Sequence, residues 1–353
     1  MDFRLSAEQD ELRALARRIF DERVTNDSQK AAAASEHGLD MALWKTLAEA
    51  GIVGIGLPEE VGGGGFGALE VAVVLEELGR ATAPVPLFAT MVAGAALSHA
   101  NALDALGGVA NGERIVTVAL VEAVGSPTAP AAIVRDGKLN GVKVCVPAGT
   151  AASAFVVTAA DGVYLVDRDA VGVEVEREDT TSGIPEAMVT FVDATARRLS
   201  DVDGLRWLVD IATAAQCLIM SGVCQRALAL TAQYAKERVQ FERPIATFQA
   251  VSQRAADSYI NTEGVRLTAW QAAWRISEGK PATEQIASAK FWASEGGLQV
   301  LHAAQHLHGG VGVDRDYPLH RCFLWGKQIE LTLGSAMPSL VRLGKLLADT
   351  PVA

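Results

Sequence analysis

The chain has 353 residues, enough for two to three domains at about 150 residues each. Half of the residues are hydrophobic, 21% are charged and the mean hydropathy is +0.20, which excludes an intrinsically disordered protein. The formal net charge of −11 argues against nucleic-acid binding and against adhesion to anionic membranes. Four cysteines are too few for a disulfide framework. The charged first residues are unlike a signal peptide, so we expect a cytoplasmic protein.

The first third of the chain has helical periodicity. Leu12, Ala16 and Ile19 fall on one face of a helix for which Ser6 is a suitable N-cap. Further helices are predicted over residues 41–50, 68–79 and 88–100.

From residue 113 the period changes to short valine-rich runs separated by turn residues such as Asp136-Gly137 and Asn140-Gly141. The runs cover residues 115–120, 131–134, 143–146, 155–158, 163–166, 171–175 and 188–192. Regular short strands of this kind favour an antiparallel sandwich or barrel over alternating βαβ units.

The helical period returns after Gly204, with later helices predicted over residues 247–278, 283–307 and 317–347. Residues 211–225 carry hardly any charge, so we expect this helix to be buried. Other subunits are one candidate for the surface that buries it. The prediction is an α+β multidomain chain with three parts. They are an N-terminal helical domain (1–112), a middle β domain (113–203) and a C-terminal helical bundle (204–353).

Two common kinds of site are disfavoured. The glycine run at residues 62–65 lacks a downstream Gly-Lys-Ser/Thr, and no Gly-x-Gly-x-x-Gly opens a βαβ unit, so no phosphate-binding loop or Rossmann site is expected. His302 and His306 share a helix face, but no third ligand is marked near them or His308, so no metal is expected. Gly309 and Gly310 are suited to capping that helix.

The segment 237–251, ERVQFERPIATFQAV, stands out because it places two arginines and two phenylalanines in a compact loop between helices. A guanidinium is suited to phosphate, and aromatic rings can pack on a planar ligand. The alternative is a helix hairpin with surface arginines.

At this segment the chain resembles the acyl-CoA dehydrogenase family, over nearly its whole length. The second distinctive match is HLHGGVGVDRDYPLHR at residues 306–321. Weaker matches are the opening helix, Leu-Pro-Glu-Glu-Val-Gly-Gly at residues 57–63 and Val-Leu-Glu-Glu-Leu-Gly-Arg at residues 74–80. The resemblance implies helices, then a β-barrel, then a four-helix bundle, in agreement with the order read from periodicity.

The resemblance also implies FAD and an acyl-CoA thioester, with a carboxylate removing the α-proton while the β-hydrogen leaves as hydride to the flavin. It implies that one subunit holds the pyrophosphate and adenosine end of a flavin seated in its neighbour. The matching cofactor-binding positions are Arg238, Phe241, Phe248, Gln249, His306, Leu307, His308, Gly309 and Gly310.

The family's catalytic glutamate is missing. The usual position of that base falls at Leu333, and the position used by a minority of members falls near Ala212. Asp210 remains a candidate base, although a shift of two residues turns a helical side chain by about 200°. Glu330 lies three residues too early. We therefore assign no catalytic residue.

Positions near the flavin ring also depart from the family. A threonine that reaches the ring is replaced by Val121, and a Trp-x-Thr sequence is replaced by Cys145-Val146-Pro147. The residues that the chain would lend to a neighbour's flavin are kept, while those for a flavin ring and proton transfer of its own are largely absent.

Three interpretations remain open. The chain resembles the smaller subunits of actinobacterial sterol side-chain acyl-CoA dehydrogenases, which implies a partner subunit without a base, paired with a longer subunit in an α2β2 tetramer. The second is a self-sufficient homo-oligomeric dehydrogenase with a displaced base. The third is a flavin-free scaffold or binding protein on the same fold; a further flavin reaction, such as that of an oxidase, also stays open.

Overall fold

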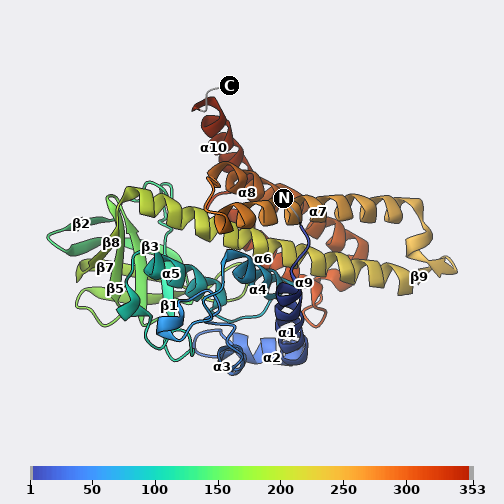
Figure 1. The fold of residues 1–353 in the computed structure, drawn as a ribbon. Coiled ribbons are helices and arrows are strands. Elements are labelled where there is room, and N and C mark those ends of the chain that lie inside the picture. Colours follow the sequence, from blue (N-terminus) through green and yellow to red (C-terminus); the bar gives the residue numbers. More distant parts are fainter. Residues whose placement is uncertain (1–2, 350–353) are drawn as a thin grey trace. The chain divides into compact units, whose positions relative to one another are not determined.

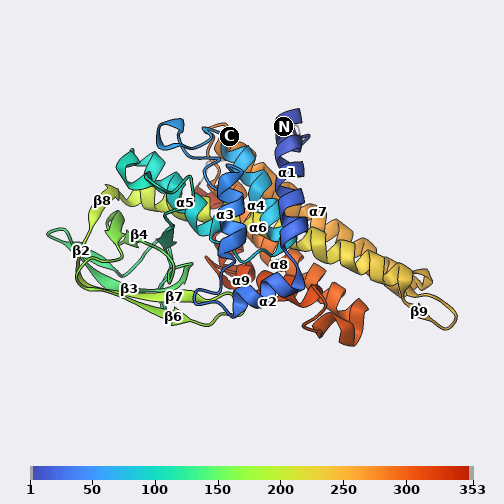
Figure 2. The same ribbon diagram turned by 90° about the horizontal axis from the view of Figure 1, so that it is seen from below.

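The computed structural model describes residues 3–349 (Figures 1 and 2); residues 1, 2 and 350–353, which include the outer ends of the first and last predicted domains, lie outside the described part. The α-helices are α1 Ala7–Arg23, α2 Asn26–Ala33, α3 Met41–Glu49, α4 Ala68–Ala81, α5 Leu87–His99, α6 Val202–Glu237, α7 Gln249–Ser277, α8 Thr283–His308, α9 Leu319–Leu331 and α10 Ala336–Asp349. The strands are β1 Val116–Ala119, β2 Ile133–Arg135, β3 Lys138–Pro147, β4 Ala154–Ala159, β5 Gly162–Asp167, β6 Val173–Glu178, β7 Glu186–Thr195, β8 Arg197–Ser200, β9 Val239–Gln240 and β10 Arg243–Pro244. The order of helices, strands and helices confirms the predicted fold class.

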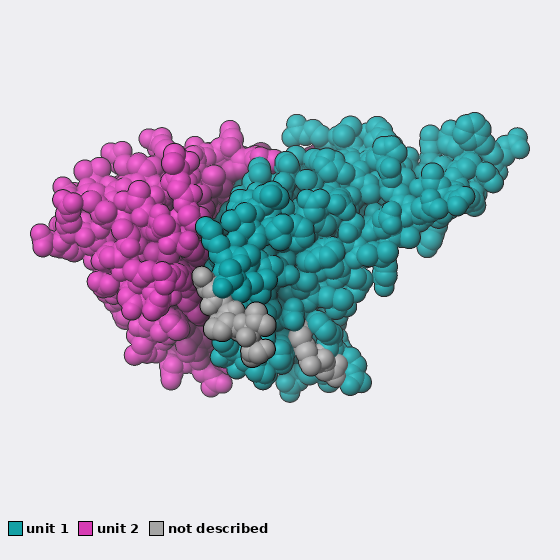
Figure 3. Space-filling model, turned by 90° about the horizontal axis from the view of Figure 1, so that it is seen from above, with its two compact units in different colours: residues 1–26, 72–83, 213–353 teal, residues 27–71, 84–212 magenta. Residues whose placement is uncertain are grey.

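The chain divides into two compact units, coloured separately in Figure 3. Unit 1 consists of residues 1–26, 72–83 and 213–353, and unit 2 of residues 27–71 and 84–212. The three domain boundaries inferred from the sequence remain a prediction, because the units are assembled from separate stretches of chain.

Unit 2 contains two four-stranded sheets, ordered β1-β4-β5-β8 and β2-β3-β7-β6. All pairings within them are antiparallel, as expected, except that β1 runs parallel to β4. Between β1 and β4 the chain passes through β2 and β3 of the other sheet, so no tight hairpin joins them and a parallel pairing is allowed.

Helix α6 is by length and composition the one helix among residues 3–349 that could cross a membrane, but 83% of its most apolar window is buried inside the chain. Its Cys217 and Cys224 are fully buried, as expected of small core residues. In unit 1, a Cβ atom added to Gly222 of α6 would clash with the carbonyl oxygen of Glu76, and one added to Gly79 of α4 would clash with that of Ile219. This chain's own helices therefore cover α6 there.

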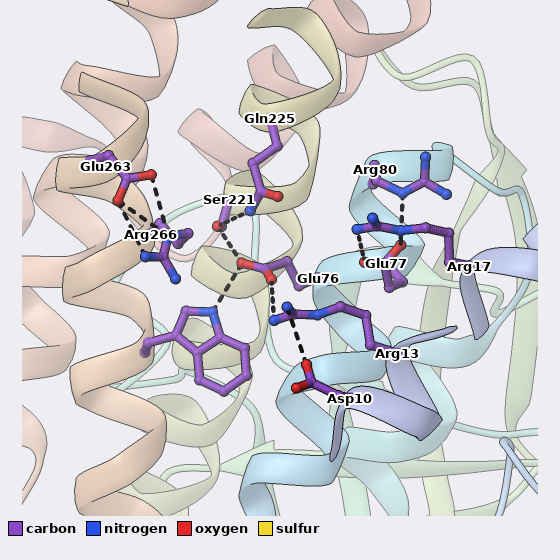
Figure 4. Close-up of polar contacts among 11 residues, drawn as sticks. Asp10, Arg13, Arg17, Glu76, Glu77, Arg80, Ser221, Gln225, Glu263 and Arg266 are labelled. Atoms are coloured by element: carbon purple, nitrogen blue, oxygen red, sulfur yellow. Dashed lines mark hydrogen bonds and ion pairs between the residues drawn. The ribbon is translucent and has the colours of Figure 1, made fainter. Parts of the chain in front are cut away.

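Two adjacent glutamates of α4 are buried in unit 1 (Figure 4). Glu76 accepts hydrogen bonds from the Ser221 hydroxyl (2.7 Å) and the Trp270 indole N–H (2.9 Å). Glu77 accepts two from the Arg17 guanidinium (2.6 and 3.0 Å) and one from Arg80 (2.7 Å). A buried carboxylate is tolerated only when it is bonded in this way. The pair thus joins α4 to α1, α6 and α7.

The C-terminal region differs from the sequence prediction of one helix over residues 317–347. Two helices, α9 and α10, replace it, because the backbone leaves the helical conformation at residues 332–335. Leu333 and Gly334 both have positive φ (57° and 102°), a left-handed conformation that ends a right-handed helix. On α8, Lys290 donates to the carbonyl of Ile329 and so binds the last turn of α9.

Candidate functional site

The distinctive loop at residues 237–251 is a β-hairpin at one end of the helices of unit 1 (Figures 1 and 2). Strands β9 and β10 pair through Gln240 and Arg243, leaving Phe241 and Glu242 as a two-residue turn with φ of 52° and 64°. Such a turn favours asparagine and glycine, so a phenylalanine there is strained. Phe241 is also 88% exposed. Strain combined with an exposed aromatic ring marks the tip as a contact surface.

Arg238 lies at the base of this hairpin, directly after α6, and its side chain is exposed. The backbone N–H of Arg238 donates to the carbonyl of Tyr234 (2.8 Å), and its carbonyl accepts from Ile245 (2.8 Å). Both backbone groups are therefore fixed while the guanidinium remains in solvent. Within residues 3–349 the guanidinium has no ion pair with a carboxylate, so its charge is available to an anion.

Phe248 and Gln249 follow the hairpin at the start of α7. The Phe248 ring packs edge-on against Phe241 (82°, centroids 6.2 Å apart), and the Arg243 guanidinium lies over it at 4.2 Å. Gln249 is exposed. The hairpin thus presents an aromatic pair, with Arg243 over the ring of Phe248 and Arg238 at the hairpin base.

The second distinctive motif begins at the end of α8, where the structure places His306, Leu307 and the glycine pair. Gly309 caps the helix with φ of 59°, which a glycine adopts without strain, as the sequence predicted. A Cβ atom on Gly309 or Gly310 would meet no other atom within 4 Å, so the backbone here is open to close approach. Leu307 is half-buried, whereas His306 is exposed and contacts Arg254 of α7.

His308 points inward. Its Nδ1 donates to the carbonyl of Ala304 (2.8 Å), and its Nε2 accepts from the Tyr317 hydroxyl (3.1 Å). The ring also stacks on Tyr234 at 4.4 Å. Burial lowers the pKa of His308, so the imidazole stays neutral. Any contact of residue 308 with a cofactor is therefore limited to its backbone.

These contacts bring the two motifs together. Tyr234 receives the backbone bond of Arg238 and stacks on His308, so a single residue joins the hairpin to the end of α8. The two motifs that Tyr234 joins carry what the pyrophosphate and adenosine end of FAD requires: exposed arginine charge, an exposed aromatic ring and open glycine backbone. The sequence had not singled out Tyr234 or Arg254, because a lone tyrosine or arginine on a helix carries no motif.

The positions of a catalytic base contain no free carboxylate. Leu333 lies half-buried in the loop between α9 and α10. Glu330 is engaged by Lys327 at 2.6 Å. Asp210, on α6 within unit 2, is only 8% exposed, and Ala212 beside it is fully buried.

The positions that the family uses at the flavin ring lie in unit 2. The carbonyl of Val121 accepts from Val144 (3.0 Å), and the backbone N–H of Cys145 donates to Glu178 (2.8 Å). Partial burial, with Glu186 and Glu178 adding negative charge, raises the pKa of the Cys145 thiol to about 11. A protonated thiol and a valine cannot replace a threonine hydroxyl and an indole, so these residues do not fit a flavin ring.

A buried ion pair lies beside these two positions. Lys143 has no exposed side-chain surface, and its Nζ lies 2.7 Å from the carboxylate of Glu122 and 3.2 Å from the Thr158 hydroxyl. Burial opposes ionisation of Glu122, but hydrogen bonds from Lys143 and from two backbone N–H groups prevail and lower its pKa. Both groups are therefore satisfied within the chain.

Comparison with known proteins agrees with this geometry. Residues 6–111 match the acyl-CoA dehydrogenase N-terminal domain, and residues 207–336 match the acyl-CoA dehydrogenase C-terminal domain. The chain is 40% identical to acyl-CoA dehydrogenase FadE27 of Mycobacterium tuberculosis, over 99% of this chain and all of the relative.

Two solved structures are similar throughout. One is a variant of the steroid ACAD Tcur3481-Tcur3483, with a TM-score of 0.93 and 45% identity over 97% of this chain and 98% of that one. The other is the ChsE4-ChsE5 complex from Mycobacterium tuberculosis, with a TM-score of 0.93 and 38% identity over the full length of both chains. The chain therefore belongs to the acyl-CoA dehydrogenase family, whose members are FAD-dependent oxidoreductases acting on the CH–CH bond of acyl-CoA thioesters.

Proposed function

We propose that this chain is the partner subunit of a hetero-oligomeric acyl-CoA dehydrogenase, completing the FAD site of a longer catalytic subunit and contributing no base. The observation that carries the proposal is an asymmetry between two sites. The hairpin with exposed Arg238 and Phe241 is intact, while Leu333 stands where the family has its glutamate.

Within such an assembly, the residues of this chain bind and orient. Arg238 neutralises the diphosphate through charge-assisted hydrogen bonds, and the ring of Phe241 packs against the flavin's adenosine end. The backbone at Gly309 and Gly310 allows close approach of the same ligand. FAD, when bound, supplies the hydride acceptor. The proton is removed by a carboxylate of the other subunit.

The likeness to steroid ACAD structures supports two finer points. Tcur3481-Tcur3483 and ChsE4-ChsE5 each combine two different chains. This supports a partner subunit and an α2β2 tetramer here. Because Tcur3481-Tcur3483 is a steroid ACAD, the likeness to it supports a CoA thioester of a sterol side chain as substrate. The buried α6 supports a soluble assembly.

A self-sufficient enzyme is the second candidate, because Asp210 is an acidic residue near a position where some relatives carry their base. Its exposure of only 8% weakens this candidate, since a base must reach the substrate.

The test is co-expression with a longer homologue that carries the glutamate. Alone, the chain is expected to purify with little FAD; together, the two chains should co-elute, retain FAD and bleach when acyl-CoA is added. Arg238→Ala should strip FAD from the complex because charge-assisted bonds worth about 1.5–3 kcal/mol are lost.

A matched control is Arg275→Ala, which removes an arginine from the far end of α7, where it donates to the carbonyl of Pro281. This control should keep its flavin. A chain that purifies alone as a yellow protein and is bleached by acyl-CoA would overturn the partner proposal. Unchanged flavin content in Arg238→Ala would overturn the interface assignment.

A further inference from the structure

Arg254 and His306 are exposed side chains that contact each other, so a cation here has an imidazole as its partner in place of a carboxylate. Arg254 lies near the start of α7, five residues after Gln249. Its guanidinium is 2.6 Å from Nδ1 of His306, near the end of α8. A guanidinium only donates, so Nδ1 must accept and the imidazole must be neutral, with its proton on Nε2. The pair therefore offers a full positive charge and an N–H donor to solvent.

The charge of Arg254 is not balanced within the chain. Among the described residues it has no ion pair, although Asp257 lies one turn further along the same exposed helix face. By contrast, Arg266 of the same helix is paired with Glu263 at 3.2 Å. An arginine whose partner is a neutral ring keeps its capacity to bind an anion.

The pair also lies beside the residues already placed at the flavin. His306 is three residues before the open backbone of Gly309, and Arg254 is on the first turns of α7 after the hairpin. With Arg238 at the hairpin base, two arginines that have no ion pair among the described residues lie at this end of the helices, in a chain of net charge −11.

We propose that Arg254 and His306 act as a unit that holds a phosphate group of the flavin, in addition to Arg238. Arg254 supplies charge and fixes the tautomer of His306, and the Nε2–H of His306 donates to a phosphate oxygen. The inference rests on the proposed function, because the flavin belongs to the complex with the longer subunit.

The test measures FAD release from the holo-complex on dilution, followed by the rise in flavin fluorescence, with size-exclusion chromatography to verify that the complex is intact. Arg254→Met should weaken FAD retention by about 10- to 100-fold, the loss expected for one charge-assisted contact. Arg266→Met, the matched control, removes a paired arginine from the same helix and should release FAD like the wild type.

His306→Leu should weaken retention to a similar degree, whereas His306→Gln keeps an N–H donor and should change it less than about threefold. The double variant Arg254→Met/His306→Leu should be no worse than the more severe single variant, because the two act as a unit. If Arg254→Met releases FAD like Arg266→Met, or if the losses in the double variant are additive, the two residues do not act as a unit at the phosphate. The proposed function would still stand. A wild-type complex that holds no FAD would instead overturn the proposed function, and this inference with it.

Discussion

Lys143 shows how much a single buried charge depends on its partner. Its ammonium group is completely enclosed in unit 2, and among residues 3–349 Glu122 provides the one carboxylate bonded to it. Glu122 and Lys143 lie close in sequence to Val121 and Cys145, the two positions at which the chain departs from the family near the flavin ring. Their ion pair belongs to the interior of unit 2.

Lys143→Met is expected to destabilise the protein by about 3–5 kcal/mol, because it leaves the Glu122 carboxylate buried without its cation. Urea unfolding monitored by circular dichroism measures the change. The double variant Lys143→Met/Glu122→Gln should recover much of the loss, since no unpaired charge remains and the amide oxygen can still accept from the backbone N–H of Ala131 or Ala132. A single variant as stable as the wild type would contradict this account of the pair.

At the scale of elements, long periodic helices and the valine-rich strands could be predicted from the sequence, and Ser6 does cap α1 through a capping box with Gln9. Other features, helix α2 among them, could not be predicted. Strand β8 and the short hairpin strands carry no hydrophobic alternation, and the break between α9 and α10 depends on a left-handed Leu333, a conformation that leucine rarely adopts.

The candidate site was predicted only in part. The motifs gave Arg238 and the glycine pair, but the inward orientation of His308 is decided by its contacts with Tyr234, which is distant in sequence, and with Tyr317, which the second motif contains without indicating the contact. The pairing of Arg254 with His306 likewise requires α7 and α8 to lie side by side. Side-chain orientation of this kind depends on tertiary packing, which a periodic pattern does not specify.

The crossing of α4 and α6 gives a test at this scale. Gly222→Ala should destabilise the protein by about 3 kcal/mol, because the new methyl group would clash with the carbonyl of Glu76 and force the helices apart. Gly344→Ala on α10 is the matched control: its methyl group meets no atom within 4 Å, and it should stabilise by about 0.5–1 kcal/mol through helix propensity. Thermal unfolding of both variants measures the difference; equal melting temperatures would show that the helices do not approach so closely.

At the scale of the whole molecule, the proposed function assigns the flavin contacts to this chain and the base to its partner. Asp210→Asn should therefore leave the turnover of the complex within about twofold of wild type, since a residue outside the chemistry has no transition-state charge to stabilise. Steady-state acyl-CoA oxidation with an artificial acceptor measures it. A collapse of turnover with normal flavin content would favour the self-sufficient enzyme, with Asp210 as its base.

The interleaved composition of the two units has a consequence for synthesis on the ribosome. Unit 2 is complete once residue 212 has been made, but residues 1–26 and 72–83 belong to unit 1 and must wait for residues 213–353. At 5–20 residues per second, roughly 10–40 s pass between the synthesis of Glu76 and that of Trp270, and Glu76 lacks its Ser221 and Trp270 partners until those residues are made. Charges flanking an apolar stretch oppose aggregation, so we expect the Glu76 carboxylate, which later joins α4 to α6 and α7, to act first as a gatekeeper of the nascent chain.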